Sequence, residues 1–177
     1  MSSLHHFYLC IGSNIQPEIH LPKAVELLRK RGRILAVSAA WESHAVGVEG
    51  PNFLNACVAM AAPCPFASAA KHIIRPVESA LGRRRTSDKN APRTIDLDVV
   101  LYDQRPSRLE YWAHAFMIVP LAELLPEYVH PILHKELAQA AEDMRKHTWI
   151  RPRAEVLPGP KRQTEGPVRG EAGRLPG

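Results

Sequence analysis

Two acidic residues interrupt the apolar run TIDLDVVLY at residues 94–102, and this run constrains the fold more than any other stretch. Side chains alternate across a β-strand, so the apolar residues at odd positions from 95 to 101 are predicted to lie on one face. Asp96 and Asp98 then share the other face, where two carboxylates repel each other unless solvent or a cation lies between them. The pair therefore predicts a strand whose second face is either exposed to solvent or part of a site for divalent cations.

The loop before this strand favours the cation site. Its sequence, GRRRTSDKNAPRT at residues 82–94, is rich in arginine, the side chain best suited to planar, bidentate recognition of phosphate. Magnesium takes carboxylate oxygens together with phosphate oxygens and water. Paired acids beside an arginine loop therefore predict a site for ATP with magnesium. A nucleic-acid-binding surface would also use the arginines, but it would leave the paired acids repelling the ligand.

The remaining patterns indicate intermixed strands and helices. An amphipathic helix is predicted over residues 17–32, because apolar residues recur at i, i+3, i+4 and i+7 from Leu21. A second helical pattern covers residues 65–82, with a kink or break expected at Pro76. Strands are expected at residues 7–13, 33–41, 53–62 and 94–102, a strand followed by a short helix at 116–131, and a final helix at 133–147. These elements predict an α/β fold.

Length and composition suit one globular domain with a substantial core, which we place at residues 1–150 of the 177. No run approaches the roughly 18 consecutive apolar residues of a membrane span, and no signal peptide is recognised. A cytoplasmic protein without membrane contacts is therefore predicted. Cys10, Cys57 and Cys64 have neither paired counts nor metal-type spacing, so they are expected to be reduced and buried.

The last 27 residues, 151–177, differ in composition from the rest. They contain five prolines, five glycines, six basic and three acidic residues, and thus carry +3 of the net charge of +5. Such a segment buries too little apolar surface to offset the entropy lost on ordering, so it is predicted to be a disordered tail. The high isoelectric point of about 9.3 follows largely from this segment and does not by itself indicate a nucleic-acid partner.

The acid-bearing stretch also resembles a known family. KNAPRTIDLDVV, residues 89–100, is similar to the signature of the 6-hydroxymethyl-7,8-dihydropterin pyrophosphokinases. Four other segments resemble that family in the same order: YLCIGSN (8–14), ESHAVG (42–47), GPNFLNACVAM (50–60) and AFMIVPLAELLPE (115–127). The resemblance implies a ferredoxin-like α+β fold, an α-β-α sandwich with a mainly antiparallel sheet. It also implies transfer of a diphosphate group from ATP to a pterin alcohol, with AMP as the second product.

Roles follow from position in these motifs. The resemblance implies that Asp96 and Asp98 bind two magnesium ions and that Arg83 and Arg93 act with them in catalysis. ATP contacts are expected from Glu78, Arg83, Arg85 and Arg93. Pterin contacts are expected from Asn14, Ser43, Val46, Phe53, Asn55 and Phe116. The expected partners are these small molecules, and the chain is expected to be a monomer that binds no nucleic acid.

One segment departs from the family pattern. Residues 103–115, DQRPSRLEYWAHA, are fewer than is usual there, lack a characteristic His-Pro or His-Tyr pair, and have His114 where an arginine is common. Arg105, Arg108 and His114 stay open as substitutes for the missing nucleotide contacts. This departure leaves a non-catalytic or altered-substrate pterin or nucleotide binder as the alternative function. An RNA-binding module that uses the basic loop and tail is a third reading.

Overall fold

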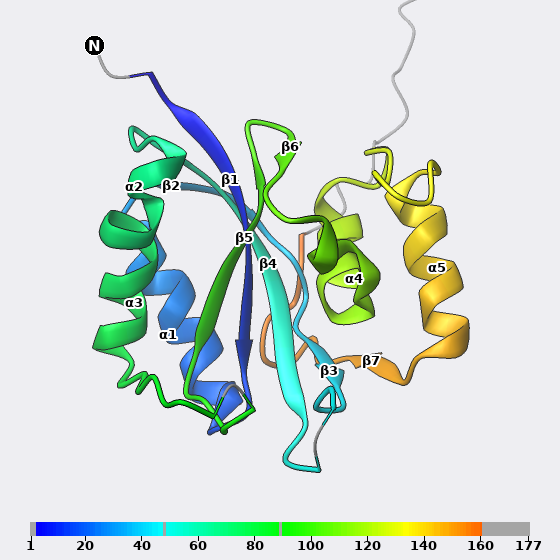
Figure 1. The fold of residues 1–177 in the computed structure, drawn as a ribbon, viewed down its shortest axis with the longest axis horizontal. Helices are drawn as coiled ribbons and strands as arrows, with labels where there is room; N and C mark the ends of the chain where they lie inside the picture. The colour runs from blue at the N-terminus through cyan, green and yellow to red at the C-terminus, as the bar shows by residue number, and fades with distance from the viewer. Residues whose placement is uncertain (1–2, 48, 89, 161–177) are drawn as a thin grey trace, which may run out of the picture.

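A seven-stranded sheet, with every strand pair antiparallel in the part described, runs through the centre of the protein (Figure 1). The structure is a computed structural model that describes residues 3–47, 49–88 and 90–160. Its strands are β1 (His5–Ser13), β2 (Arg33–Val37), β3 (Trp41–Ser43), β4 (Phe53–Ala62), β5 (Asp96–Tyr102), β6 (Arg105–Pro106) and β7 (Ile150–Pro152). Their order is β6-β5-β1-β4-β3-β7, and β2 also pairs with β4.

Helices cover both faces of the sheet. They are α1 (Pro17–Arg29), α2 (Phe66–Ala69), the π-helical turn η1 (Ala70–Ile74), α3 (Arg75–Ala80), the 3-10 helix η2 (Leu109–Ala113), α4 (Ala115–Leu124) and α5 (Leu137–His147). Helices α1, α2 and α3 lie on one side, and α4 and α5 on the other (Figure 1). The predicted α+β sandwich with a mainly antiparallel sheet is confirmed. Among the described helices, none is both long and apolar enough to cross a membrane.

Strand β5 carries Asp96 and Asp98 on one face, as its alternation predicts, while Leu97 and Val99 join the core under α1 and α3. The prediction is wrong at Leu101. The register of β5 against β1 shifts between Val99 and Leu101, so Val100 has no partner and the later side chains change face. Leu101 therefore packs in the core on the α4 and α5 side.

The two N-terminal helical patterns form as predicted. Helix α1 buries Leu21, Ala24, Val25 and Leu28. The second pattern is divided, with η1 directly before α3 and Pro76 in the first turn of α3. Proline has no N–H to bond the carbonyl four residues earlier, and a wider turn accommodates that loss.

The strand predicted at the start of residues 116–131 is wrong, because Ala115–Leu124 is the helix α4. This helix is apolar on almost every side, since it lies between the sheet and α5 and buries seven of its residues. A helix buried all round shows no 3.6-residue alternation of apolar and polar residues. Its sequence therefore lacks the feature that distinguishes it from a buried strand. The single strand predicted at 33–41 is likewise two strands, β2 and β3.

The start of the predicted disordered tail is ordered. Strand β7 pairs with β3, the Ala40 amide donates to the Leu157 carbonyl at 3.0 Å, and the Leu157 side chain is buried in the core. The domain boundary expected after residue 150 therefore lies further along the chain, beyond Leu157. The rest of the predicted tail, residues 161–177, falls outside the described residues.

Candidate active site

Two neighbouring cavities open beside β5 and share Asp98. The first, which we name the aromatic cavity, has a volume of about 250 Å³. It is lined by Cys10, Ile11, Gly12, Ser43, His44, Ala45, Val46, Phe53, Asn55, Asn90, Arg93, Asp96, Asp98, Phe116 and Met117. The second, the arginine cavity, has a volume of about 770 Å³ and is lined by residues of α2 and α3, by residues 97–99 of β5 and by residues from the segment 107–111. Its polar lining comprises Arg75, Glu78, Ser79, Arg83, Arg85, Asp98, Ser107, Arg108 and Tyr111.

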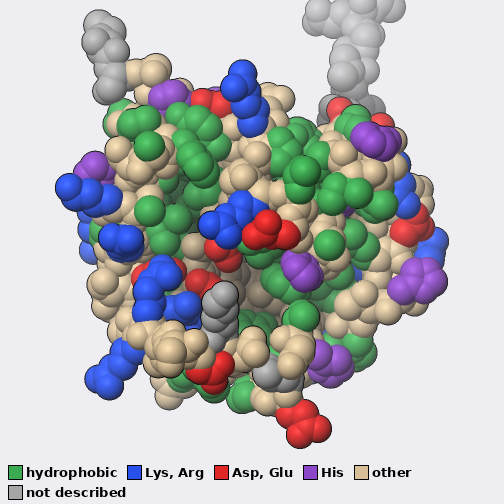
Figure 2. Space-filling view, viewed as in Figure 1, with side chains coloured by type: hydrophobic (Ala, Val, Ile, Leu, Met, Phe, Trp, Pro, Cys, Tyr) green, Lys and Arg blue, Asp and Glu red, His purple; other side chains and the backbone are tan. Residues whose placement is uncertain are grey.

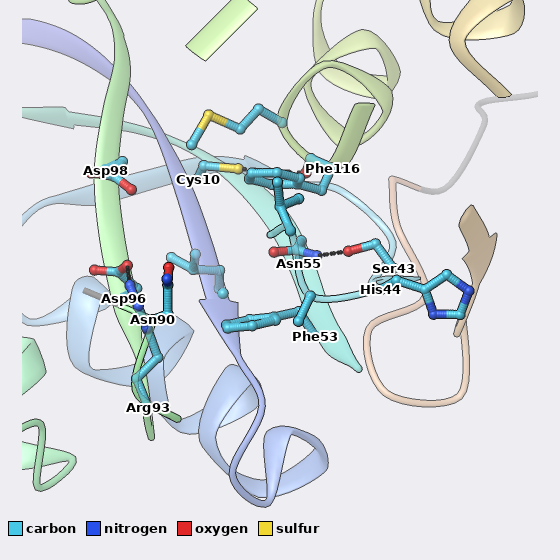
Figure 3. A pocket seen from close by; sticks show the side chains of 15 residues that line it. Cys10, Ser43, His44, Phe53, Asn55, Asn90, Arg93, Asp96, Asp98 and Phe116 are labelled. Carbon is cyan, nitrogen blue, oxygen red and sulfur yellow. Dashed lines mark hydrogen bonds and ion pairs between the residues drawn. The ribbon is translucent and has the colours of Figure 1, made fainter. Parts of the chain in front are cut away.

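Two aromatic rings and one amide face the aromatic cavity. Phe53 comes from the start of β4 and Phe116 from the first turn of α4, and Figure 3 shows their rings on opposite sides of the cavity with Asn55 between them. Asn55 is only 4% exposed, and its Nδ2 donates to Ser43 Oγ at 3.0 Å. That hydrogen bond fixes the orientation of the amide, whose polar atoms are available to a ligand only from within the cavity.

The two acids differ in their partners. Asp96 lies between two arginines, with Arg93 Nη1 at 2.6 Å from Oδ2 and Arg83 Nη2 at 3.5 Å from Oδ1. Asp98 accepts a hydrogen bond of 2.9 Å from the Tyr111 hydroxyl group. Burial, with the nearby charge of Asp96, raises the pKa of Asp98, and the Tyr111 hydrogen bond offsets part of this shift. Within the described part of the chain, arginines form ion pairs with Asp96 and none with Asp98.

The arginine cavity combines cations with one buried acid. Glu78 is buried; its Oε1 accepts the Leu97 N–H at 3.3 Å, and its Oε2 pairs with Arg85 Nη2 at 2.8 Å. Arg83 donates from Nη1 to the Ile95 carbonyl at 3.0 Å, while its buried Nε has no hydrogen-bond partner among the described atoms. Figure 2 shows the molecule in the orientation of Figure 1, with basic and acidic side chains gathered around a hollow in the middle of the visible face.

Most of the predicted site residues come together here, from segments far apart in the chain. Asp96, Asp98, Arg93, Ser43, Val46, Phe53, Asn55 and Phe116 line the aromatic cavity, and Glu78, Arg83 and Arg85 line the arginine cavity. Val46 lies at the rim, with 60% of its surface exposed. Asn14 lines neither cavity. Its Oδ1 accepts the Arg93 N–H at 2.8 Å, so it holds the backbone of the arginine loop.

Sequence reasoning missed Tyr111, Cys10 and Gly12. Tyr111 belongs to the segment that departs from the family pattern, and only the altered length of that segment drew attention to it. Cys10 of β1 lies opposite Asp98 in the register of β1 against β5, and it lines the aromatic cavity. Burial raises the pKa of the Cys10 thiol well above its ordinary value, so this side chain is a neutral part of the wall.

The protein family described as 7,8-dihydro-6-hydroxymethylpterin-pyrophosphokinase (HPPK) matches residues 8–126. The chain belongs to the HPPK family. The 2-amino-4-hydroxy-6-hydroxymethyldihydropteridine pyrophosphokinase of Aquifex aeolicus is 34% identical over 143 residues, covering 75% of this chain and 88% of that protein. The protein of the same name from Bacillus subtilis is 30% identical over 149 residues, covering 77% and 84%. The predicted family is therefore confirmed.

A solved structure described as HPPK-DHPS in complex with substrates shares the fold. It has a TM-score of 0.60 and 10% sequence identity, and the match covers 82% of this chain and 44% of that chain. At this identity the likeness concerns the HPPK fold alone. The match supports the mixed helix and strand fold with a mainly antiparallel sheet.

The two carboxylates of β5 fit a magnesium ion that takes some of its ligands from the protein and the others from a nucleotide. Both carboxylates line the aromatic cavity, and Asp98 also lines the arginine cavity. Among the described residues there is no group of three or more His, Cys, Asp or Glu able to hold a metal ion. Magnesium is commonly bound by one or two carboxylates with phosphate oxygens and water completing its shell. Two acids beside a cationic cavity match this requirement.

Proposed function

We propose that this chain transfers the pyrophosphoryl group of ATP to 6-hydroxymethyl-7,8-dihydropterin and releases AMP, a step of folate biosynthesis. One observation carries the proposal: Asp98 lines both cavities, so a ring in one and a triphosphate in the other meet at the paired acids. Membership of the HPPK family supports the same assignment.

We assign the pterin to the aromatic cavity. The rings of Phe53 and Phe116 would stack on its two faces, since offset stacking of flat rings adds to the gain from burying them. Asn55, oriented by Ser43, would hydrogen-bond the polar edge of the pterin. Val46 would cover the rim, and Asn14 would act indirectly by holding the arginine loop at Arg93.

We assign the triphosphate to the arginine cavity and its border with Asp98. Arg83 and Arg85 would bind phosphate oxygens from within this cavity, and Arg93 would reach them from the adjoining aromatic cavity, because guanidinium groups match phosphate in geometry and charge. Glu78 lines the same cavity, but both of its oxygens are engaged with Leu97 and Arg85. Its contribution would be to position Arg85 and β5.

Asp96 and Asp98 would hold two magnesium ions. When bound, such ions neutralise the charge of the phosphate oxygens and lower the pKa of an alcohol they contact. The chain itself supplies alignment, because the two cavities hold the reactants at one junction. The pterin hydroxyl oxygen attacks the β-phosphorus, the bond between that phosphorus and the α,β-bridging oxygen breaks, and AMP leaves with that oxygen. We assign acceptance of the hydroxyl proton to Asp98.

The decisive experiment incubates the full chain with ATP, magnesium and the pterin alcohol. AMP and the pterin diphosphate should form in equal amounts, and neither should form when the pterin or magnesium is left out. A non-catalytic binder is the second candidate, favoured by the short segment 103–115. Binding of the pterin and ATP without AMP release would establish that candidate and contradict turnover. A monomeric state and a cytoplasmic location stay predictions.

A further inference from the structure

One polar group of the short segment 103–115 contacts the paired acids. It runs through β6 and η2, and from η2 the Tyr111 hydroxyl group donates to Asp98 Oδ1 at 2.9 Å. Among the described residues, no lysine or arginine forms an ion pair with Asp98, whereas Asp96 pairs with Arg83 and Arg93. The hydroxyl group is thus the partner that the tertiary structure supplies to the second acid.

The residue after Tyr111 holds η2 in place. Trp112 is fully buried, stacks on Tyr128 with ring centroids 5.6 Å apart, and meets the His130 ring edge-on at 5.3 Å. His130 is itself buried, and its Nε2 donates to the Trp112 carbonyl at 2.9 Å while its Nδ1 accepts the N–H groups of Ile132 and Leu133. These contacts make a rigid base for the Tyr111 ring.

We propose that Tyr111 is a positioning residue for Asp98, which it orients for metal binding. The inference rests on the proposed function, in which Asp98 is a magnesium ligand. A hydrogen bond to Oδ1 fixes the carboxylate plane and leaves Oδ2 and the remaining lone pair of Oδ1 for a cation. Partners of this kind orient metal ligands, and their loss commonly costs about 10- to 100-fold in metal affinity or activity.

A neutral donor suits this position better than a cation. An arginine at Tyr111 would neutralise Asp98 and compete with a divalent ion for it, whereas a hydroxyl group orients the carboxylate without cancelling its charge. Tyr111 also lines the arginine cavity, where it contacts the space assigned to the triphosphate.

The test compares Tyr111→Phe with a matched control. Tyr128→Phe removes a hydroxyl group that donates to the Gln104 carbonyl at 2.8 Å, a contact to the same segment that does not involve Asp98. Mn²⁺ binding is measured by electron paramagnetic resonance on the full chain with an α,β-methylene analogue of ATP. Tyr111→Phe should weaken Mn²⁺ binding about 10- to 100-fold, and Tyr128→Phe should leave it at the wild-type value.

Kinetics provide a second readout. The Mg²⁺ concentration for half-maximal AMP release should rise by a similar factor in Tyr111→Phe, while the KM for the pterin, which is assigned to the other cavity, stays near wild type. Tyr111→Leu removes the same hydroxyl group with a different apolar side chain, so the result does not depend on the folding of one variant. In the Asp98→Asn background, adding Tyr111→Phe should weaken Mn²⁺ binding no further.

Unchanged Mn²⁺ binding in Tyr111→Phe would overturn the inference. Equal losses in the Tyr111 and Tyr128 variants would also overturn it, because the hydroxyl group would then serve only the stability of the segment. The proposed function is tested separately by AMP release from the wild-type chain. If that chain forms no AMP but only the Tyr111 variants bind Mn²⁺ more weakly, the enzyme proposal fails and the role of Tyr111 stands.

Discussion

Arg93 and Asp96 form an ion pair of 2.6 Å at the point where the arginine loop becomes β5. Both side chains are partly exposed to the aromatic cavity, so a ligand can reach them. A triphosphate offers Arg93 an anion and a magnesium ion offers Asp96 a cation. In the proposed function, binding of the nucleotide with its metal therefore exchanges this internal pair for two pairs with the ligand.

Asp96→Asn and Asp98→Asn should each lower AMP release on the order of 10³-fold, because each removes one negative charge from the proposed metal site. The fold should persist, since neither side chain belongs to the apolar cores. Rates at saturating Mg²⁺ and the Tm of each variant check this. Asp143→Asn, on α5 and outside both cavities, is the control of the same chemistry. Wild-type rates in either β5 variant would contradict the metal assignment.

Gly12→Ala should raise the KM for the pterin about 10-fold with little change in kcat. A Cβ at this position would lie 2.9 Å from Asn55 Oδ1, so the amide that we assign to the pterin edge must move. Pterin affinity measured by fluorescence gives an independent value. Gly50→Ala is the control, because nothing lies within 4 Å of its Cβ. An unchanged KM in Gly12→Ala would argue against the role of Asn55.

Protonation of Glu42 should make the protein less stable at low pH. Burial alone would raise its pKa, but hydrogen bonds from Asn52, Arg151 and Arg153 outweigh burial and lower the pKa from 4.5 to about 2. A carboxyl group with a lowered folded-state pKa stabilises the fold above its unfolded pKa, and that stabilisation is lost as pH falls toward the folded pKa. Because Arg151 is largely exposed, solvent weakens its interaction, and we expect the free energy of unfolding to fall by about 2 kcal/mol between pH 6 and pH 2.

Urea unfolding at pH 6 and at pH 2 measures this loss. Glu42→Gln should be less stable than wild type at pH 6, and the difference between the two should shrink by about 2 kcal/mol at pH 2. Glu142→Gln, at an exposed position on α5, should track wild type at both values. A constant difference between wild type and Glu42→Gln would show that the network does not depend on the charge of Glu42.

Leu157→Ala should lower the free energy of unfolding by about 2 kcal/mol, since it removes a buried side chain from the core beside α1. Leu35→Ala, at a position with 45% of its surface exposed, should change stability by about 0.5 kcal/mol or less. Chemical denaturation compares the two. Equal, small effects would mean that the segment after β7 contributes little to the fold.

The amino-acid sequence by itself determined the features that depend on neighbouring residues. Two-residue alternation placed Asp96 and Asp98 on one face of β5, helical spacing gave the buried face of α1, and the order of short motifs gave the family. The α+β class with an antiparallel sheet followed from that resemblance and is confirmed.

Only the tertiary structure decided which distant groups meet. The hydrogen bond from Tyr111 to Asp98, the hold of Asn14 on Arg93, and the burial of Leu157 join residues far apart in the chain. The sequence predicts a strand at the start of helix α4, because burial on all sides removes its helical periodicity. The bulge at Val100 moves the later side chains to the other face, and no local sequence feature predicts it. Periodicity reports how a segment relates to its own neighbours, whereas these contacts depend on how the whole chain packs.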